Sequence, residues 1–184
     1  MTSELQVGRR VIELRQGDIT TIPADAIVNA ANSSLAGGGG VDGAIHRAGG
    51  RAVMADLIRR YGQDRHCPTG SAVVGAAGDL PAKWVIHAVG PRWGGGDRGE
   101  PDQLTSAYRA AFDLARELGS RTVTAPSLST GVYRFPIEQA APIALAAARD
   151  HLSTDTTVDR ITFVLFSQET FDAFEGALMA LAGE

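Results

Sequence analysis

Short apolar runs in the first half of the chain predict buried strands, because continuous apolar segments bounded by glycine or proline are typical of strands covered on both faces. These strands are expected at residues 11–14, 26–29, 71–77 and 84–89. Between the second and third strands, residues 42–61 are predicted to be helical. A break at Gly49-Gly50 divides this region into two shorter helices.

In the second half, apolar residues recur at the spacing of amphipathic helices. One set steps by four, three, four and three residues and ends before Gly119: Leu104, Tyr108, Ala111, Ala115 and Leu118. Further helices are predicted at residues 137–152 and 171–181, and strands at residues 122–125 and 161–166. Strands that alternate with helices predict an α/β fold with a largely parallel sheet covered on both faces.

Composition narrows the class of protein. The 184 residues, 44% of them apolar and 21% charged, are typical of one globular domain, here residues 1–184. A formal net charge of −4 argues against nonspecific binding of nucleic acid through a basic face. Cys67 is the only cysteine, which excludes an intramolecular disulfide and favours a reducing compartment. No apolar segment is long enough to span a membrane, so we expect a soluble, cytoplasmic protein.

The segment from Ala26 to Gly50 combines a strand, a glycine run and a helix start. Gly37–Gly40 come after the strand, and Asp42 opens the predicted helix. Glycines let backbone N–H groups approach a ligand, and a helix N-terminus adds partial positive charge. This order predicts an anion or nucleotide site, and a flexible linker is the alternative interpretation.

Other ligand motifs fit poorly. Gly38, Gly40 and Gly43 match the dinucleotide fingerprint G-x-G-x-x-G, but eight residues separate this pattern from its strand. The phosphate-loop sequence G-x-x-x-x-G-K-[ST] does not occur. The four histidines are scattered along the chain, at His46, His66, His87 and His151. We therefore expect neither a metal nor a cofactor.

Three loops follow strands at the sheet edge where α/β proteins bind ligands, beyond the carboxyl ends of parallel strands. They are the glycine run after residues 26–29, the loop at residues 127–135, and the turn after Phe166. All three carry small or aromatic residues rather than long charged ones. This composition suits a ligand with phosphates in its middle and a base at one end.

Six motifs, in five separate stretches, follow one another along the chain: GDIT at 17–20, VNAAN at 28–32, GGGGVDG at 37–43 with AIH directly after it at 44–46, VIHAVGP at 85–91 and STGVYRFP at 129–136. In this order they resemble the motifs of the MacroD-type macrodomains, over about residues 15–175. The resemblance implies a three-layer α/β/α fold with a central mixed, largely parallel sheet. It also implies ADP-ribose as the ligand and hydrolysis of mono-ADP-ribose from Glu or Asp side chains.

The same resemblance implies roles for individual residues. Asp42 would be the catalytic carboxylate with His46 close by, Asp18 would bind the adenine amino group, and Phe166 would stack on the base. Asn32 would bind the hydroxyls of the distal ribose. The full set of substrate-binding positions is Asp18, Ile19, Asn32, Gly38, Gly39, Gly40, Val41, Ser129, Thr130, Gly131, Val132, Tyr133 and Phe166.

Each of the main positions also has a purely structural interpretation. Asp18 can form an Asx turn, and Asn32 can cap local backbone. Phe166 can be the last core residue of its strand. Asp42 can stabilise a helix start, with His46 as its ion partner one turn later. For any one of these residues, the structural interpretation competes with the functional one. For the whole set, which occurs in the same order as in the family, the functional interpretation is favoured.

The function implied by the resemblance is an ADP-ribosyl hydrolase that acts on ADP-ribosylated protein, with O-acyl-ADP-ribose as a related substrate. The base that activates water would be Asp42 or the pyrophosphate of the substrate. Two alternatives are a reader module that binds ADP-ribose without turnover and a hydrolase of ADP-ribosylated nucleic acid. The expected assembly is a monomer. Arg134 departs from the family pattern, which more often has glycine there, and this leaves the distal-ribose end of the site open.

Overall fold

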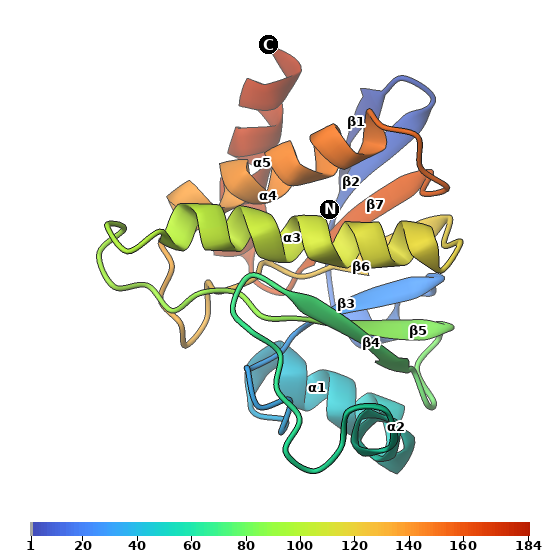
Figure 1. Ribbon diagram of the computed structural model, residues 1–184. Coiled ribbons are helices and arrows are strands. Elements are labelled where there is room, and N and C mark those ends of the chain that lie inside the picture. Colours follow the sequence, from blue (N-terminus) through green and yellow to red (C-terminus); the bar gives the residue numbers. More distant parts are fainter. Residues whose placement is uncertain (1) are drawn as a thin grey trace.

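The computed structural model describes residues 2–184 and contains one mixed sheet with helices on both faces (Figure 1). The strands are β1 (Thr2–Val7), β2 (Arg10–Gln16), β3 (Ala26–Ala30), β4 (Ala72–Ala76), β5 (Trp84–Ala88), β6 (Thr122–Ala125) and β7 (Arg160–Leu165). The helices are α1 (Gly40–Gly49), α2 (Arg51–Tyr61), α3 (Glu100–Glu117), α4 (Ile137–Leu152) and α5 (Gln168–Ala182). A short 3₁₀ turn covers Ile19–Thr21.

The sheet has the strand order β1-β2-β7-β6-β3-β5-β4. The strands from β2 to β5 in this order run parallel, whereas β1 and β4 pair antiparallel at the two edges. The carboxyl ends of the parallel strands therefore lie at one edge of the sheet, which brings the loops after β2, β3, β5, β6 and β7 together.

Alternate side chains of the strands pack on opposite faces of the sheet, in two separate layers of the hydrophobic core. Val28 and Ile86 face a large cluster with α3, α4 and α5, whereas their neighbours Ile27 and Val85 face the side of α1. Leu57 of α2 packs on that second side in a smaller cluster. This period of two follows from the pleat of a strand, and it confirms the predicted three-layer α/β/α fold with a mixed, largely parallel sheet.

The structure corrects the sequence-based prediction at one missing strand and two boundaries. Strand β1 was not predicted, because TSELQV contains few apolar residues and only alternate side chains are half-buried at the sheet edge. Helix α1 begins at Gly40 rather than at Asp42, so Asp42 lies in its first turn. Strand β7 ends at Leu165, which leaves Phe166 outside the strand. Within residues 2–184, no helix is both long and apolar enough to cross a membrane.

Candidate functional site

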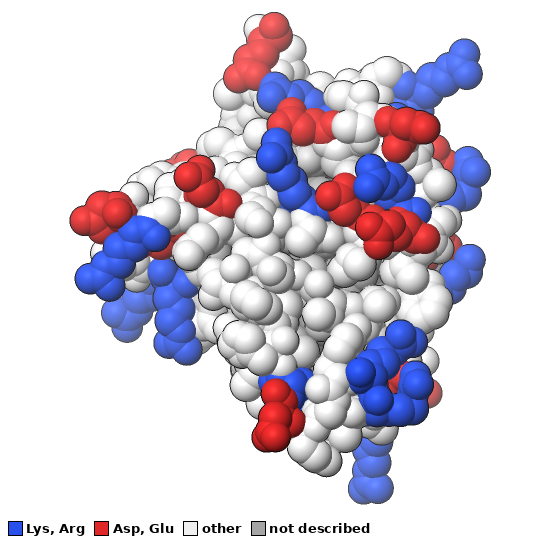
Figure 2. Space-filling view, viewed as in Figure 1, with Lys and Arg blue, Asp and Glu red and all other residues white. Residues whose placement is uncertain are grey.

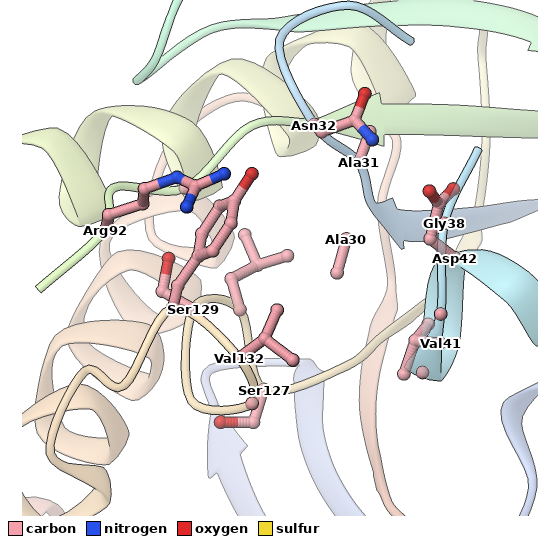
Figure 3. Close-up of a pocket in the computed structure, with 16 residues that line it drawn as sticks. Ala30, Ala31, Asn32, Gly38, Val41, Asp42, Arg92, Ser127, Ser129 and Val132 are labelled. Carbon is pink, nitrogen blue, oxygen red and sulfur yellow. The ribbon is translucent and has the colours of Figure 1, made fainter. Parts of the chain in front are cut away.

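A cavity of about 360 Å³ opens at the carboxyl ends of β3, β5 and β6 (Figure 3). The segment after β3 and the start of α1 form one wall, and the loop after β6 forms the other. Its lining residues are Ala30, Ala31, Asn32, Gly38, Gly39, Gly40, Val41, Asp42, Gly90, Arg92, Ser127, Leu128, Ser129, Gly131, Val132 and Tyr133. The edge of the sheet that was predicted to bind a ligand therefore carries a cavity.

Asp42 is almost buried at one end of this cavity, with 6% of its surface exposed. Its Oδ1 accepts a hydrogen bond from Asn29 Nδ2 at 2.8 Å and lies 3.3 Å from His46 Nε2. A Cβ placed on Gly38 would lie 3.3 Å from the other oxygen, Oδ2. No hydrogen bond to Oδ2 is found among residues 2–184, so this oxygen is available on the side of the cavity wall.

Asn32 has the local backbone role that its residue type allows, and it also lines the cavity. Its Nδ2 donates to Gly37 O at 2.9 Å, and its Oδ1 accepts from Ala36 N at 3.2 Å and from Ser34 Oγ at 2.9 Å. These bonds close the turn before the glycine run. The run is therefore an ordered wall held by Asn32, and the linker interpretation is wrong.

The loop at 127–135 is anchored from below by aromatic side chains. Tyr108 of α3 donates its hydroxyl hydrogen to Pro126 O at 3.0 Å and accepts from Leu128 N at 2.8 Å. The ring of Phe135 is buried and lies 4.7 Å from that of Trp93. These contacts fix the loop opposite Gly38–Val41, while Val132, at its tip, remains 91% exposed.

Ser129 is held in a strained backbone conformation inside this loop. Its φ of +67° lies in the left-handed region, and Phe135 N donates to its carbonyl at 2.9 Å. Its hydroxyl is buried with no hydrogen-bond partner among the described residues. A Cβ on Gly90 would come within 2.1 Å of this hydroxyl, so only glycine fits at position 90.

Five of the predicted site residues do not line the cavity. His46 is behind the wall against Asp42, and Thr130 donates to Ser127 Oγ at 2.8 Å within its loop. Ile19 is buried with Ile27 and Val164 in the core. Asp18 accepts from Thr20 N at 2.9 Å and begins the 3₁₀ turn, in agreement with the Asx-turn interpretation.

Phe166, the fifth of these residues, is 82% exposed, so its interpretation as a core residue is wrong. It directly follows β7, whose neighbour β2 leads to Asp18. Both residues therefore lie beyond strands on the β2–β7 side of the cavity. Their roles toward a base stay predictions.

Six lining residues were not among the predicted site positions: Ala30, Ala31, Gly90, Arg92, Ser127 and Leu128. Most of these directly follow a predicted strand, and their place at a carboxyl end was the available signal. Arg92 also follows a predicted strand, but it belongs to a long loop whose course no local sequence pattern indicates. Its guanidinium lies 4.7 Å from the centre of the Tyr133 ring, and Figure 3 shows it at the opposite side of the cavity from Asp42.

Fold and site together define an α/β protein with a ligand cavity at the carboxyl ends of parallel strands, walled by a glycine run and a helix start. The Macro domain family profile matches residues 28–144. The chain therefore belongs to the Macro domain family, which confirms the resemblance of its motifs.

Similar proteins cover nearly the whole chain. A Macro domain-containing protein in the sno 5′ region of Streptomyces nogalater is 54% identical over 167 residues, 89% of each protein. O-acetyl-ADP-ribose deacetylase 2 of Pantoea vagans is 46% identical and covers 89% of this chain and 95% of its own. A mutant Oceanobacillus iheyensis macrodomain with ADPR is 34% identical, covers 100% of both chains and superimposes with a TM-score of 0.92.

Proposed function

We propose that this macrodomain binds ADP-ribose and hydrolyses acyl esters of its distal ribose. The substrates are O-acyl-ADP-ribose and mono-ADP-ribose linked to Glu or Asp side chains of proteins. The deacetylase name of the Pantoea vagans relative and the ADPR in the Oceanobacillus iheyensis structure support this class of ligand and reaction. The observation that carries the proposal is the Asp42 carboxylate in the cavity wall, with Oδ1 bound by Asn29 Nδ2 and close to His46 Nε2, and with Oδ2 available.

The order of the strand ends gives a direction for the ligand. The adenine would lie on the side of Asp18 and Phe166, after β2 and β7, and the distal ribose beside Asn32 and Asp42, after β3. The pyrophosphate would then cross between Gly38–Val41 and the loop at 127–135. Backbone N–H groups and the N-terminus of α1 would supply its donors.

The proposed chemistry needs a base, a positioned water and an available leaving group. For a Glu- or Asp-linked substrate, Asp42 Oδ2 takes a proton from water as the water oxygen bonds to C1″ of the distal ribose. The C1″–O bond to the protein carboxylate breaks, and the carboxylate leaves with the electron pair. In O-acyl-ADP-ribose the water attacks the acyl carbon instead, and the ribose hydroxyl leaves after it regains a proton. Because Asp42 is nearly buried, little water screens its negative charge. Its electrostatic effect on the reaction is therefore stronger than that of an exposed carboxylate.

The charge distribution bears on the nucleic-acid alternative. Lys and Arg side chains are interspersed with Asp and Glu on the face shown in Figure 2, and the net charge is −4. This face has no continuous basic strip of the kind that tracks a phosphate backbone. A protein or small-molecule ester is therefore the proposed substrate.

The deciding experiment incubates the protein with a glutamate-ADP-ribosylated protein and, separately, with O-acetyl-ADP-ribose. Release of free ADP-ribose from the first, and of acetate from the second, is the expected result. Calorimetry with ADP-ribose runs in parallel, with an expected Kd in the micromolar range, about −7 to −9 kcal/mol. Binding without release would make the protein a reader, and no binding at millimolar ADP-ribose would overturn the proposal entirely.

A further inference from the structure

A buried polar pair lies directly behind Asp42, and the proposed chemistry does not use it. Asn29 of β3 and His87 of β5 are register partners in neighbouring parallel strands. Both side chains are essentially inaccessible, at 0% and 1% exposure. They share the sheet face of Ile27 and Val85, which face the core below α1. Burial of a polar pair in such a place costs free energy unless its polar atoms form hydrogen bonds.

The contacts of the pair connect His87 to the carboxylate. Asn29 Nδ2 donates to Asp42 Oδ1 at 2.8 Å and lies 3.1 Å from His87 Nδ1. The amide nitrogen has two hydrogens, one for each of these acceptors. The opposite orientation of the amide would press its oxygen against the Asp42 carboxylate. His87 Nδ1 must therefore accept, which leaves the ring proton on Nε2.

The other side of the imidazole has no polar partner. His87 Nε2 is buried and makes no hydrogen bond among the described residues. A Cβ on Gly75 would lie 3.3 Å from it and 3.4 Å from Leu57 Cδ2, so backbone and an apolar side chain enclose this end of the ring. An apolar residue would avoid a buried donor without an acceptor. The unfavourable placement indicates that the Nδ1 lone pair has a function.

Burial of the ring, more than the charges around it, keeps the Nδ1 lone pair unprotonated at neutral pH. Burial, and after it the nearby His46, lowers the pKa of His87 to about 4, whereas Asp42 and Asp56 act in the opposite direction. His46 and Asp42 approach from α1, with the two imidazole rings 6.1 Å apart, and Asp56 belongs to α2. The facing strand β4 contributes Gly75, which has no charge. A neutral ring accepts from Asn29, whereas a protonated ring would repel the amide hydrogens.

We propose that His87 is a positioning residue for the hydrolysis reaction: as a neutral acceptor it fixes the Asn29 amide, which holds Asp42 Oδ1 so that Oδ2 stays on the cavity side. This inference rests on the proposed function, because it assigns Asp42 a role in turnover. His87 itself is buried and does not line the cavity, so its side chain is not placed to contact a ligand there. Its effect reaches the reaction through two hydrogen bonds.

The kinetic test compares two substitutions of His87. His87→Leu removes the acceptor and keeps an apolar side chain of similar size, whereas His87→Asn puts an amide oxygen near the position of Nδ1. With O-acetyl-ADP-ribose, we expect kcat to fall at least about tenfold in His87→Leu and to recover most of its value in His87→Asn. The Kd for ADP-ribose should change less than about threefold in both variants. His151→Leu is the matched control, because it removes a buried histidine that bonds to Thr156 away from the cavity, and its kcat should not change.

A second measurement needs no variant that folds and no substrate. Nitrogen-15 NMR of the wild-type histidine rings at pH 7 should show His87 as the neutral tautomer protonated on Nε2, and lowering the pH to 5 should leave it unchanged. An Nδ1–H tautomer, or an imidazolium above pH 5, would overturn the proposal even if the protein hydrolyses no ester. A folded His87→Leu protein with wild-type kcat would overturn it as well. Absence of turnover in the wild type, with the expected tautomer, would instead count against the proposed function.

Discussion

At the scale of single residues, the proposed reaction rests on Asp42. Its Oδ1 accepts a hydrogen bond from Asn29 and lies close to His46 Nε2, and an amide oxygen at the same position can also accept from Asn29. We therefore expect Asp42→Asn to fold and to bind ADP-ribose with unchanged affinity, while the hydrolysis rate falls about 10²–10⁴-fold because the base is lost. Single-turnover release of ADP-ribose measures this. A rate near that of the wild type would leave the substrate pyrophosphate as the base and reduce Asp42 to a stabiliser of the helix start.

Gly39 tests whether the glycine run must remain open to a ligand. Its φ is −97°, which any residue adopts, and a Cβ there would meet no protein atom within 4 Å. We expect Gly39→Val to fold normally and to lose about tenfold or more in ADP-ribose affinity, since the added methyl groups occupy space beside the cavity. Gly176→Val is the control, because position 176 in α5 is equally open and lies elsewhere. Equal affinities in the two variants would mean that the ligand does not approach Gly39.

Phe166 tests the adenine end. An exposed aromatic ring beyond β7 makes no core contact, so its removal should leave the fold intact. If the ring stacks on the base, Phe166→Ala weakens ADP-ribose binding by roughly 1–3 kcal/mol. Met179→Ala, which removes an exposed apolar side chain from α5, should have no effect in the same calorimetric titration. Unchanged binding in a folded Phe166→Ala protein would place the base elsewhere.

At the scale of elements, the sequence predicts those helices and strands whose burial leaves a regular pattern of apolar residues. The helices α3, α4 and α5 follow the apolar spacing of their residues, because burial of one face determines both pattern and structure. Strand β1 escapes prediction, since an edge strand with half-buried alternate residues needs little apolar sequence. The glycine run and the loop at 127–135 were predictable parts of the site. Arg92 was not, because its approach to Tyr133 depends on the course of the loop at 91–99.

Glu100 determines the course of the loop at 91–99 through hydrogen bonds to its backbone. Hydrogen bonds from backbone N–H groups, its own first and then those of Gly94, Arg98 and Gly96, lower its pKa to about 2 against the raising effect of desolvation. Since the folded pKa is below the ordinary 4.5, this contribution to stability is complete above pH 4.5 and is lost as the pH falls towards 2. Glu100→Gln should therefore lower the unfolding temperature at pH 7 and make it fall less steeply below pH 4.5. Parallel slopes of Tm against pH in the two proteins would contradict this.

At the scale of the whole molecule, the strand order assembles the site from distant parts of the chain. The parallel arrangement of β2, β7, β6, β3 and β5 brings residues near positions 18, 32, 90, 129 and 166 to one edge. The family motifs indicated these positions, but only the topology gives their order along the edge of the sheet. The roles of Asp18 and Phe166, and a single domain over residues 1–184, remain predictions that the binding experiments and a cooperative unfolding transition would test.

Val132 lines the cavity and yet is almost fully exposed, which has a thermodynamic consequence. A ligand that covers this isopropyl group, and the ring of Phe166, releases ordered water from apolar surface and lowers the heat capacity of the system. The binding enthalpy of ADP-ribose should therefore become more favourable as temperature rises, with a negative slope in calorimetric titrations between 10 and 35 °C. Val132→Ser should make this slope shallower, whereas an equal slope would mean that the side chain stays hydrated in the complex.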